Sequence, residues 1–408
     1  MSSPAPLRPA VRRPGLAILI AITAVGPLAL NIFIPSMPGL QKVFDADYGT
    51  IQLSLSLYLI GIAVAQLFYG PLSDRFGRRP ALLGGMALFL FGSLVCLLAP
   101  SIEMLIAGRV LQAVGACAGM VLARAIIRDL YDRAEAASRL GYVMMAMVVA
   151  PMLAPSIGGL LDLWFGWRAS FAFVALCGVA VLGAALIALH ETNPARQAGG
   201  HPASFLLGFL RLLRMPAFNG YAWQGAFTSG VFFSFLGGAP YVMVELLGRT
   251  PAEYGLWFIS LSAMYMFGNF LAGRFSARIG SDRMIWYGVA LGLLGTSTLT
   301  LSVLAGAVSP VFLFGGMSIV SIGNGLSLPN GMAGAVSVAP KMAGAASGLA
   351  GFLQMGVGAG LSYLAGMLLQ DSALPLALIM LAAALAAIAA HALGRSWSIR
   401  RQEAARKA

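Results

Sequence analysis

Arg109 carries the one charge that lies clearly inside a long apolar stretch of this chain, the segment AGRVLQAVGACAGMVLARAII from residue 107 to 127. A buried guanidinium needs hydrogen-bond acceptors or an anion, because burying an unpaired charge is very costly. The fourteen Asp and Glu residues fall near the ends of apolar segments, and none lies deep inside one. We therefore predict that Arg109 is an unneutralised cation in a binding site, where it contacts oxygen atoms of a small-molecule substrate.

Further polar and aromatic side chains interrupt the apolar segments. Polar groups are costly in lipid and usually face the interior of a helical bundle. Pockets for apolar small molecules are lined by aromatic rings and a few polar groups. These rules predict a substrate-binding or coupling site that contains Asn31, Tyr58, Gln112, Tyr221, Gln224, Phe232, Tyr265 and Gln354 together with Arg109. The aromatic members also suit a packing surface or an interfacial belt, and that alternative stays open.

The other reactive residue types show no catalytic or metal-binding pattern. The three cysteines, at positions 96, 117 and 177, lie in apolar runs, and the three histidines are scattered. No spacing suits a nucleophile with its base or a set of metal ligands. We expect a protein that is not an enzyme and that carries no metal and no cofactor.

The composition indicates the environment of these side chains. Of the 408 residues, 59% are hydrophobic and 10% are charged, whereas a soluble domain carries about 25% charged residues. A helix of about 20 apolar residues crosses a bilayer. We predict an all-α membrane protein with twelve transmembrane helices, at approximately 15–38, 51–70, 80–99, 102–127, 138–162, 167–190, 217–240, 251–275, 284–305, 309–336, 343–369 and 373–394.

The positive charges follow the topology of these segments. The net charge is +12, and most Arg and Lys residues lie at the termini or after even-numbered segments. Only Lys42, Arg168 and Arg249 fall in the opposite loops. Because cytoplasmic loops are enriched in Lys and Arg, both termini are predicted to be cytoplasmic. This topology explains the basic charge without nucleic acid, and the expected partner is the lipid bilayer.

A polar stretch divides the chain into two six-segment halves, 1–190 and 217–408. Residues 191–216 are predicted to form a cytoplasmic linker, whose second part, SFLLGFLRLLRMP, suits an amphipathic helix at the membrane interface. A shift of 203 residues aligns Arg75 with Arg278 and Gly77 with Gly280. Such repeats are typical of transporters with a substrate site between the halves. Since one chain contains a complete pathway, we expect a functional monomer.

The loop after the second segment reads GPLSDRFGRRPALL, from residue 70 to 83. It places an aspartate and three arginines around a short turn that contains a glycine. One interpretation is a conformational latch, in which the aspartate pairs with arginines and a neighbouring helix end. The alternative is a charged turn that only sets topology. The predicted latch residues are Gly70, Asp74, Arg75, Gly77, Arg78 and Arg79.

The fifth segment contains two prolines four residues apart, Pro151 and Pro155, followed by Gly158 and Gly159. Each proline removes an intrahelical hydrogen bond and bends the helix. The glycines permit close contact with a helix of the other half. We predict a gating helix that seals the pathway while the halves move. A kinked packing helix without a gating role is the alternative.

The signature loop at 70–80, its degenerate copy after the eighth segment, the 6+6 repeat and the polar linker resemble the major facilitator superfamily. Four stretches resemble its Bcr/CflA branch of drug-resistance transporters, which includes chloramphenicol and florfenicol exporters: TIQLSLSLYLIGIAVAQLFYGPLSDRFGRRPALLGG, GRVLQAVGACAG, APMLAPSIGGLL and FGWRASFAF. The resemblance implies multidrug efflux by alternating access across the bacterial inner membrane, as a proton antiporter. The implied substrates are small, mostly neutral or apolar drugs or toxic metabolites.

One position departs from the branch. Asn31 lies at about the same depth as Arg109, and the branch commonly has an aspartate there. A carboxylate in a partly dry cavity can carry a proton, but asparagine cannot titrate. Proton coupling therefore stays open, with Asp162 or Glu245 as other candidates for the coupling group. The alternative function is a facilitator or exchanger of an anionic or neutral metabolite.

Overall fold

The computed structural model describes residues 14–193 and 202–407, which form helices joined by short turns. The N-terminal half contains α1 (Leu16–Ile32), η1 (Ile34–Ser36), α2 (Leu40–Phe44), α3 (Tyr48–Phe76), α4 (Arg78–Leu97), α5 (Ile102–Leu130), α6 (Arg133–Phe165) and α7 (Arg168–Ala188). After α8 (Pro202–Leu213), the C-terminal half contains α9 (Pro216–Tyr241), the π-helical turn η2 (Val242–Leu246), α10 (Pro251–Ile279), α11 (Ser281–Leu304), α12 (Pro310–Val338), η3 (Pro340–Met342), α13 (Ala343–Leu368) and α14 (Leu374–Lys407).

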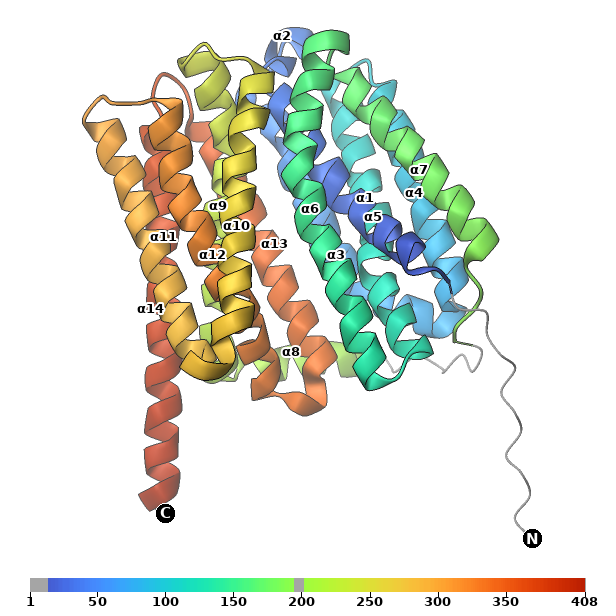
Figure 1. Cartoon of the computed structure of the whole chain (residues 1–408), viewed down its shortest axis with the longest axis vertical. Coiled ribbons are helices and arrows are strands. Elements are labelled where there is room, and N and C mark those ends of the chain that lie inside the picture. Colours follow the sequence, from blue (N-terminus) through green and yellow to red (C-terminus); the bar gives the residue numbers. More distant parts are fainter. Residues whose placement is uncertain (1–13, 194–201, 408) are drawn as a thin grey trace.

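Twelve helices in the described ranges are long and apolar enough to cross a membrane, which confirms the predicted all-α architecture. Figure 1 shows two groups side by side, α1 with α3 to α7 and α9 to α14, while α8 lies across one end. We call the end with α8 the cytoplasmic side and the end with α2 the outer side, following the predicted topology. Two features were not predicted. α1 ends at Ile32 and is followed by the short elements η1 and α2. α14 continues through Gly394 to Lys407, because residues 395–407 contain no Gly or Pro.

Side-chain caps start four of the long helices on the outer side. Asp47 accepts a hydrogen bond from the Thr50 main-chain N–H at 3.0 Å and from the Thr50 hydroxyl at 2.7 Å. These bonds hold the pKa of the Asp47 carboxylate below its ordinary value. Ser101, Thr250 and Ser309 cap α5, α10 and α12 in the same way. Each cap satisfies an N–H group that the helix itself cannot pair.

The two halves repeat their backbone geometry at the loops that the sequence shift aligns. Gly77 ends α3 with φ +104°, and Gly280 ends α10 with φ +93°. Only glycine adopts this backbone region readily. Two further aligned glycines, Gly85 and Gly288, lie against α5 and α12, and a Cβ at Gly288 would be 2.5 Å from the Gly323 carbonyl oxygen. Small residues therefore bring the membrane helices of both halves into close contact.

The halves meet at their outer ends. Ser156 of α6 donates to the Gly255 carbonyl of α10 at 2.7 Å. Gln52 of α3 donates to the Ser362 hydroxyl of α13 at 2.6 Å, and Tyr48 donates to the Gly237 carbonyl of α9 at 2.6 Å. These contacts close the interface between the halves on the side of α2.

Candidate functional site

A cavity of about 270 Å³ lies between the two halves. α1, α3, α5 and α6 contribute Pro27, Leu30, Asn31, Ile62, Met120, Met147 and Pro151, and α9, α10, α12 and α13 contribute Ser229, Phe232, Phe233, Phe258, Leu261, Ser262, Tyr265, Ser321, Asn324, Leu328, Gln354 and Met355. None of these lining residues carries a charge at neutral pH. Methionines supply adaptable apolar contacts, which suit ligands of varied shape.

The polar groups of the cavity are amides and hydroxyls. Asn31, Asn324 and Gln354 supply amides, and serines on α9, α10 and α12 supply hydroxyls. The Asn31 amide nitrogen donates to the Pro27 carbonyl at 2.8 Å. Its amide oxygen is buried without a hydrogen-bond partner in the described structure. A ligand with an N–H or O–H group would satisfy that oxygen, because an unpaired buried acceptor is costly.

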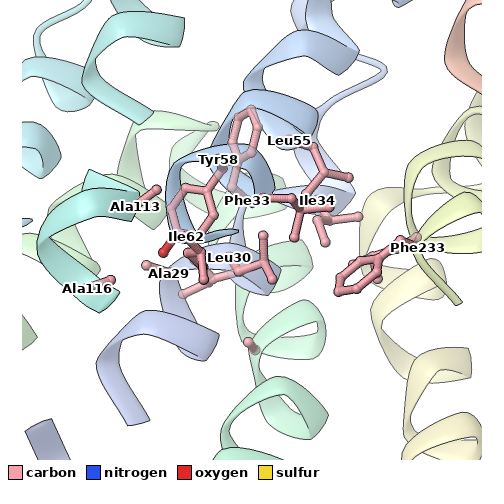
Figure 2. Packing of buried hydrophobic residues seen from close by; sticks show 14 of the residues in the cluster. Ala29, Leu30, Phe33, Ile34, Leu55, Tyr58, Ile62, Ala113, Ala116 and Phe233 are labelled. Atoms are coloured by element: carbon pink, nitrogen blue, oxygen red, sulfur yellow. The ribbon is translucent and has the colours of Figure 1, made fainter. Parts of the chain in front are cut away.

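Aromatic side chains of α9 form part of the opposite wall. The rings of Phe232 and Phe233 lie 5.5 Å apart in an edge-to-face arrangement. Figure 2 shows Phe233 across from Leu30 and Ile62 of the N-terminal half. Apolar side chains from both halves thus surround the same space, with the amides among them.

Arg109 does not line this cavity. Its side chain is fully buried inside the N-terminal half, and the guanidinium lies 4.1 Å from the centre of the Tyr58 ring. One guanidinium nitrogen, Nη1, donates to the Ala29 carbonyl at 2.9 Å and to Gln112 Oε1 at 2.6 Å. The Gln112 amide donates onward to the Ser93 hydroxyl at 2.9 Å. Arg109 therefore connects α1, α4 and α5.

The end of α1 explains why a main-chain oxygen pairs with Arg109. The helix stops at Ile32, so its last four carbonyls, including that of Ala29, lack ordinary intrahelical donors. Pro35 lacks an N–H and cannot extend the hydrogen-bond ladder. The carboxyl end of a helix carries partial negative charge, which stabilises a cation there. The sequence does not mark this acceptor, because every residue carries a main-chain carbonyl.

The predicted substrate residues separate into three places. Asn31, Phe232, Tyr265 and Gln354 line the cavity. Tyr58, Arg109 and Gln112 form the buried network behind its wall. Tyr221 and Gln224 lie elsewhere in the C-terminal half, where Tyr221 donates to the Asp282 carboxylate at 2.7 Å and Gln224 donates to the Thr228 hydroxyl at 3.0 Å.

Several lining residues were absent from the predicted site. Those with polar or thioether side chains are the serines at 229, 262 and 321, Asn324, and the methionines at 120, 147 and 355. Serine and methionine are common in membrane helices, so their presence alone is a weak signal. Asn324 had a usable signal, because an amide inside a span usually faces the bundle interior.

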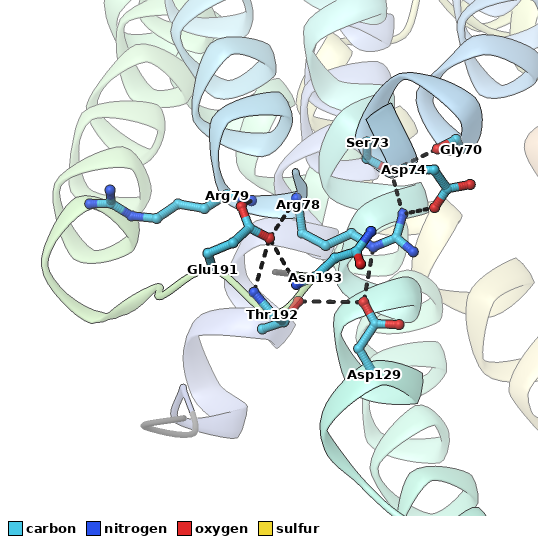
Figure 3. Close-up of polar contacts among 9 residues, drawn as sticks. All are labelled: Gly70, Ser73, Asp74, Arg78, Arg79, Asp129, Glu191, Thr192 and Asn193. Carbon is cyan, nitrogen blue, oxygen red and sulfur yellow. Dashed lines mark hydrogen bonds and ion pairs between the residues drawn. The ribbon is translucent and has the colours of Figure 1, made fainter. Parts of the chain in front are cut away.

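Three of the predicted latch residues, Asp74, Arg78 and Arg79, belong to a compact polar network on the cytoplasmic side (Figure 3). Arg78 contacts the Asp74 carboxylate at 2.6 Å and the Asp129 carboxylate of α5 at 2.9 Å. The Glu191 carboxylate accepts from the main-chain N–H groups of Arg78 at 2.9 Å and Arg79 at 3.3 Å. These partners all belong to the N-terminal half or to the start of the linker.

The remaining latch residues have simpler surroundings. A Cβ at Gly77 would collide with the Glu191 carboxylate, and its φ is positive, so the turn needs glycine. The Arg75 guanidinium lies 5.3 Å from the Phe76 ring centre. A Cβ at Gly70 would meet no atom within 4 Å, so the structure gives no packing reason for glycine there.

The predicted gating residues follow α6 from the cavity to the outer side. Pro151 lines the cavity. A Cβ at Gly159 would be 2.5 Å from the Pro251 carbonyl of α10, so Gly159 permits contact with the other half. Gly158 instead faces the Ile32 carbonyl of α1, in its own half. α6 remains helical through both prolines.

Comparisons with known proteins agree with this architecture. The sequence profile of the Major Facilitator Superfamily matches residues 19–363. The chain is 32% identical to the multidrug resistance protein D of Escherichia coli (strain K12) over 90% of this chain and 91% of that protein. It is 32% identical to a chloramphenicol resistance protein of Pseudomonas aeruginosa over 79% of this chain and 75% of that protein.

A solved structure shares the fold. It is a bacterial homologue of the human lysosomal transporter Spinster in an inward-facing, unoccupied conformation, with a TM-score of 0.75 and 17% sequence identity, covering 93% of this chain and 95% of that chain. The resemblance to drug-resistance transporters is confirmed by the relatives, which include a bicyclomycin resistance protein homologue of Haemophilus influenzae at 26% identity over 91% of this chain and 93% of that protein. The profile match, the relatives and the twelve-helix fold together show that this chain is a membrane transporter of the major facilitator superfamily and not an enzyme.

Proposed function

We propose that this transporter exports small neutral or apolar drugs, or toxic metabolites of similar chemistry, across the bacterial inner membrane. The observation that carries the proposal is the cavity between the halves, whose walls are apolar apart from uncharged amides and hydroxyls. Drug-sized ligands bind in such pockets, where a few polar groups set orientation. The names of the multidrug and chloramphenicol resistance relatives support the same substrate class.

The uncharged walls favour neutral substrates over cations. A cation that leaves water loses its hydration, and only a carboxylate or several oriented acceptors offset that cost. No Asp or Glu lines the cavity. Arg109 stays behind the wall, where it adds positive potential on the side of α1. Neutral substrates with an N–H or O–H group suit the unpaired Asn31 oxygen.

Transport proceeds by alternating access, with both termini in the cytoplasm and the monomer as the working unit. The halves already contact each other on the outer side through Ser156, Gln52 and Tyr48. Export requires that these contacts break so that the cavity opens outward. α6 and α10 form part of that outer gate, since Gly159 and Gly255 each lie against main-chain oxygens across the interface.

The energy source has two candidates. The family resemblance favours proton antiport. The cavity favours a facilitator or exchanger of an anionic or neutral metabolite, because no lining residue is Asp, Glu or His. Proteoliposomes that contain a pH-sensitive dye distinguish them. Proton movement on addition of chloramphenicol supports antiport, whereas substrate movement without proton flux supports the second candidate.

A susceptibility panel tests the proposed substrate class. An efflux-deficient bacterium that expresses the chain is expected to tolerate more chloramphenicol and bicyclomycin than the empty strain, with little change for cationic dyes. Gln354→Ala removes a cavity amide and should reduce the protection. Gln41→Ala, on the outer helix α2 and outside the cavity, is the control. Unchanged tolerance across neutral drugs, at normal expression, contradicts the proposal.

A further inference from the structure

A second hollow lies on the cytoplasmic side of the C-terminal half, away from the central cavity. Its volume is about 580 Å³, and its walls come from the end of α8, the first turns of α9 and the last membrane turns of α14. We call it the α9–α14 groove. Its lining includes Arg214, Asn219, Trp223, Phe227, Ala389 and Leu393. Nothing in the proposed transport cycle uses these residues.

α9 and α14 pack against each other along their length, and the groove lies beside a point of close contact near their cytoplasmic ends. A Cβ at Gly220 would be 2.6 Å from the Gly394 Cα, so the helices cross there in close contact. Along α14 the wall then consists of alanines, which leave space. On α9 the rings of Trp223 and Phe227 stack with their centres 5.8 Å apart. Ala389 and Leu393 are exposed, so this apolar wall faces the lipid.

The cytoplasmic end of the groove is polar and positive. Arg214 is exposed and forms no ion pair within the described residues. Asn219 donates from its amide nitrogen to the Leu213 carbonyl at 2.6 Å, which orients the amide. The Asn219 amide oxygen is buried and has no hydrogen-bond donor in the described structure. This end therefore offers one cation and one unsatisfied acceptor.

A neighbouring recess is lined by one cation, Arg395, and by one carboxylate, Asp282, which accepts a hydrogen bond from Tyr221 at 2.7 Å. These two opposite charges offset each other, so the recess does not reverse the positive charge of Arg214. Arg214 is exposed at the mouth of the groove, where its charge is complementary to an anionic headgroup.

The depth of the groove matches one leaflet. From Pro216 to Phe227 a helix rises about 16 Å, which is roughly half of the ~30 Å hydrocarbon core. A ligand that fills it has an anionic head at the level of Arg214 and an apolar chain beside Trp223 and Phe227. Basic pockets between membrane helices on the cytoplasmic side bind lipid headgroups in this way.

We propose that the α9–α14 groove binds an anionic phospholipid of the cytoplasmic leaflet. Its phosphate contacts Arg214, a headgroup hydroxyl of the phosphatidylglycerol type donates to the Asn219 oxygen, and an acyl chain lies against Trp223 and Phe227. The site is independent of the substrate cavity, so it holds whatever the transported molecule is.

Quenching of tryptophan fluorescence by brominated lipids tests the site in the full-length purified protein. The Trp223 signal is the difference between the wild type and Trp223→Phe, which keeps an aromatic ring in the wall. Brominated phosphatidylglycerol should quench that signal at a lower mole fraction than brominated phosphatidylcholine. Arg214→Gln should weaken the preference by about fivefold, the effect of one cation near an anionic lipid.

The control variant is Arg211→Gln, which removes an exposed arginine in the last turn of α8 that does not line the groove. It should keep the preference for phosphatidylglycerol. Equal quenching by the two lipids overturns the proposal. So does a result in which Arg214→Gln and Arg211→Gln weaken the preference for phosphatidylglycerol equally. Native mass spectrometry gives a second readout. A bound phosphatidylglycerol that Arg214→Gln removes supports the site, whereas a second copy of the chain or displacement by inorganic phosphate contradicts it.

Discussion

Arg109 shows how a membrane protein can hold a buried cation without a carboxylate. Its Nη1 donates to a helix-terminal carbonyl and to an amide oxygen, and the guanidinium packs on the Tyr58 ring. Its Nε and Nη2 are buried without a hydrogen-bond partner in the described structure. Cation–π contact and a helix end each stabilise a guanidinium without an ionic partner. The residue thus fixes the end of α1 against α5.

Arg109→Ala is expected to destabilise the whole N-terminal half. The Ala29 carbonyl and the Gln112 amide oxygen would lose their donor, at about 1–3 kcal/mol for each unsatisfied group. Thermal unfolding of the purified protein should show a lower Tm, and transport of every substrate should fall together. Arg211→Ala, on the exposed side of α8, should leave the Tm unchanged. Wild-type stability with abolished transport would instead assign Arg109 to substrate binding or coupling.

Asn31→Asp introduces a carboxylate into the cavity wall. The acid is neutral at low pH and charged at high pH, so export of a cationic dye should appear as the pH rises and disappear as it falls. Export of neutral drugs should decline over the same range, because a charged wall stays hydrated. Efflux of the cationic dye and of a neutral drug, measured between about pH 5 and 9, tests both expectations. Asn269→Asp, outside the cavity lining, is the control, and matching pH profiles for the two variants would contradict the cavity placement.

At the scale of helices, the caps on the outer side contribute stability that depends on pH. Asp47→Ala should lower the free energy of unfolding by about 1 kcal/mol. Because the folded-state pKa of Asp47 is lowered by its bonds from Thr50, the cap is fully present above about pH 5. It is lost as the pH falls through that lowered pKa. The free energies of unfolding of the variant and the wild type should therefore converge in acid, whereas Gln41→Ala, which removes no titratable group, should show no such trend.

The contact between α6 and α10 depends on residues without side chains. A Cβ at Gly255 would be 2.5 Å from the Pro155 carbonyl oxygen, on the rigid backbone of α6. Gly255→Ala should hold the outer ends of α6 and α10 apart, because overpacking costs about 1–3 kcal/mol. The closed outer side would then be less stable, and transport should fall severalfold. Gly141→Ala on α6, where a Cβ meets no atom within 4 Å, is the matched control. Equal uptake rates for the two variants in vesicles would count against the outer gate.

At the scale of the molecule, a few hydrogen bonds set the balance between conformations. Tyr48 and Gln52 each donate across the interface between the halves. Removing both bonds with Tyr48→Phe and Gln52→Ala should favour the outward-open state by about 2 kcal/mol, a change on the order of 30-fold in population. Spin labels at Val43, on α2 of the N-terminal half, and at Arg249, in the turn before α10, should then report a longer distance.

Thr298→Val provides the control for that measurement. The Thr298 hydroxyl is exposed and bonds only the Leu294 carbonyl one turn away in the same helix. Its loss should leave the distance distribution unchanged. A double variant that also keeps the wild-type distribution would show that other contacts hold the outer side closed.

The amino-acid sequence was enough to predict a membrane protein, its twelve spans, the asymmetric distribution of positive charge and the family. Length and hydropathy suffice for these, because lipid requires about 20 apolar residues for each helix. The sequence also shows the internal repeat, because a shift of 203 residues aligns Gly77 with Gly280. Both residues have a positive φ, which residues other than glycine rarely adopt. The substrate, latch and gating roles of the named residues stay predictions.

Which polar side chains share the cavity became clear only from the packing of the helices. In these spans both helix faces are apolar, so periodicity does not separate the face toward the cavity from the face toward a neighbouring helix. Asn31 and Gln354 face the same space from different halves, whereas Arg109 and Gln112 are enclosed within one half. The partner of Arg109 arises only where α1 ends beside α5 and exposes a carbonyl. A main-chain oxygen belongs to every residue, so no sequence pattern marks the one that a buried cation will contact.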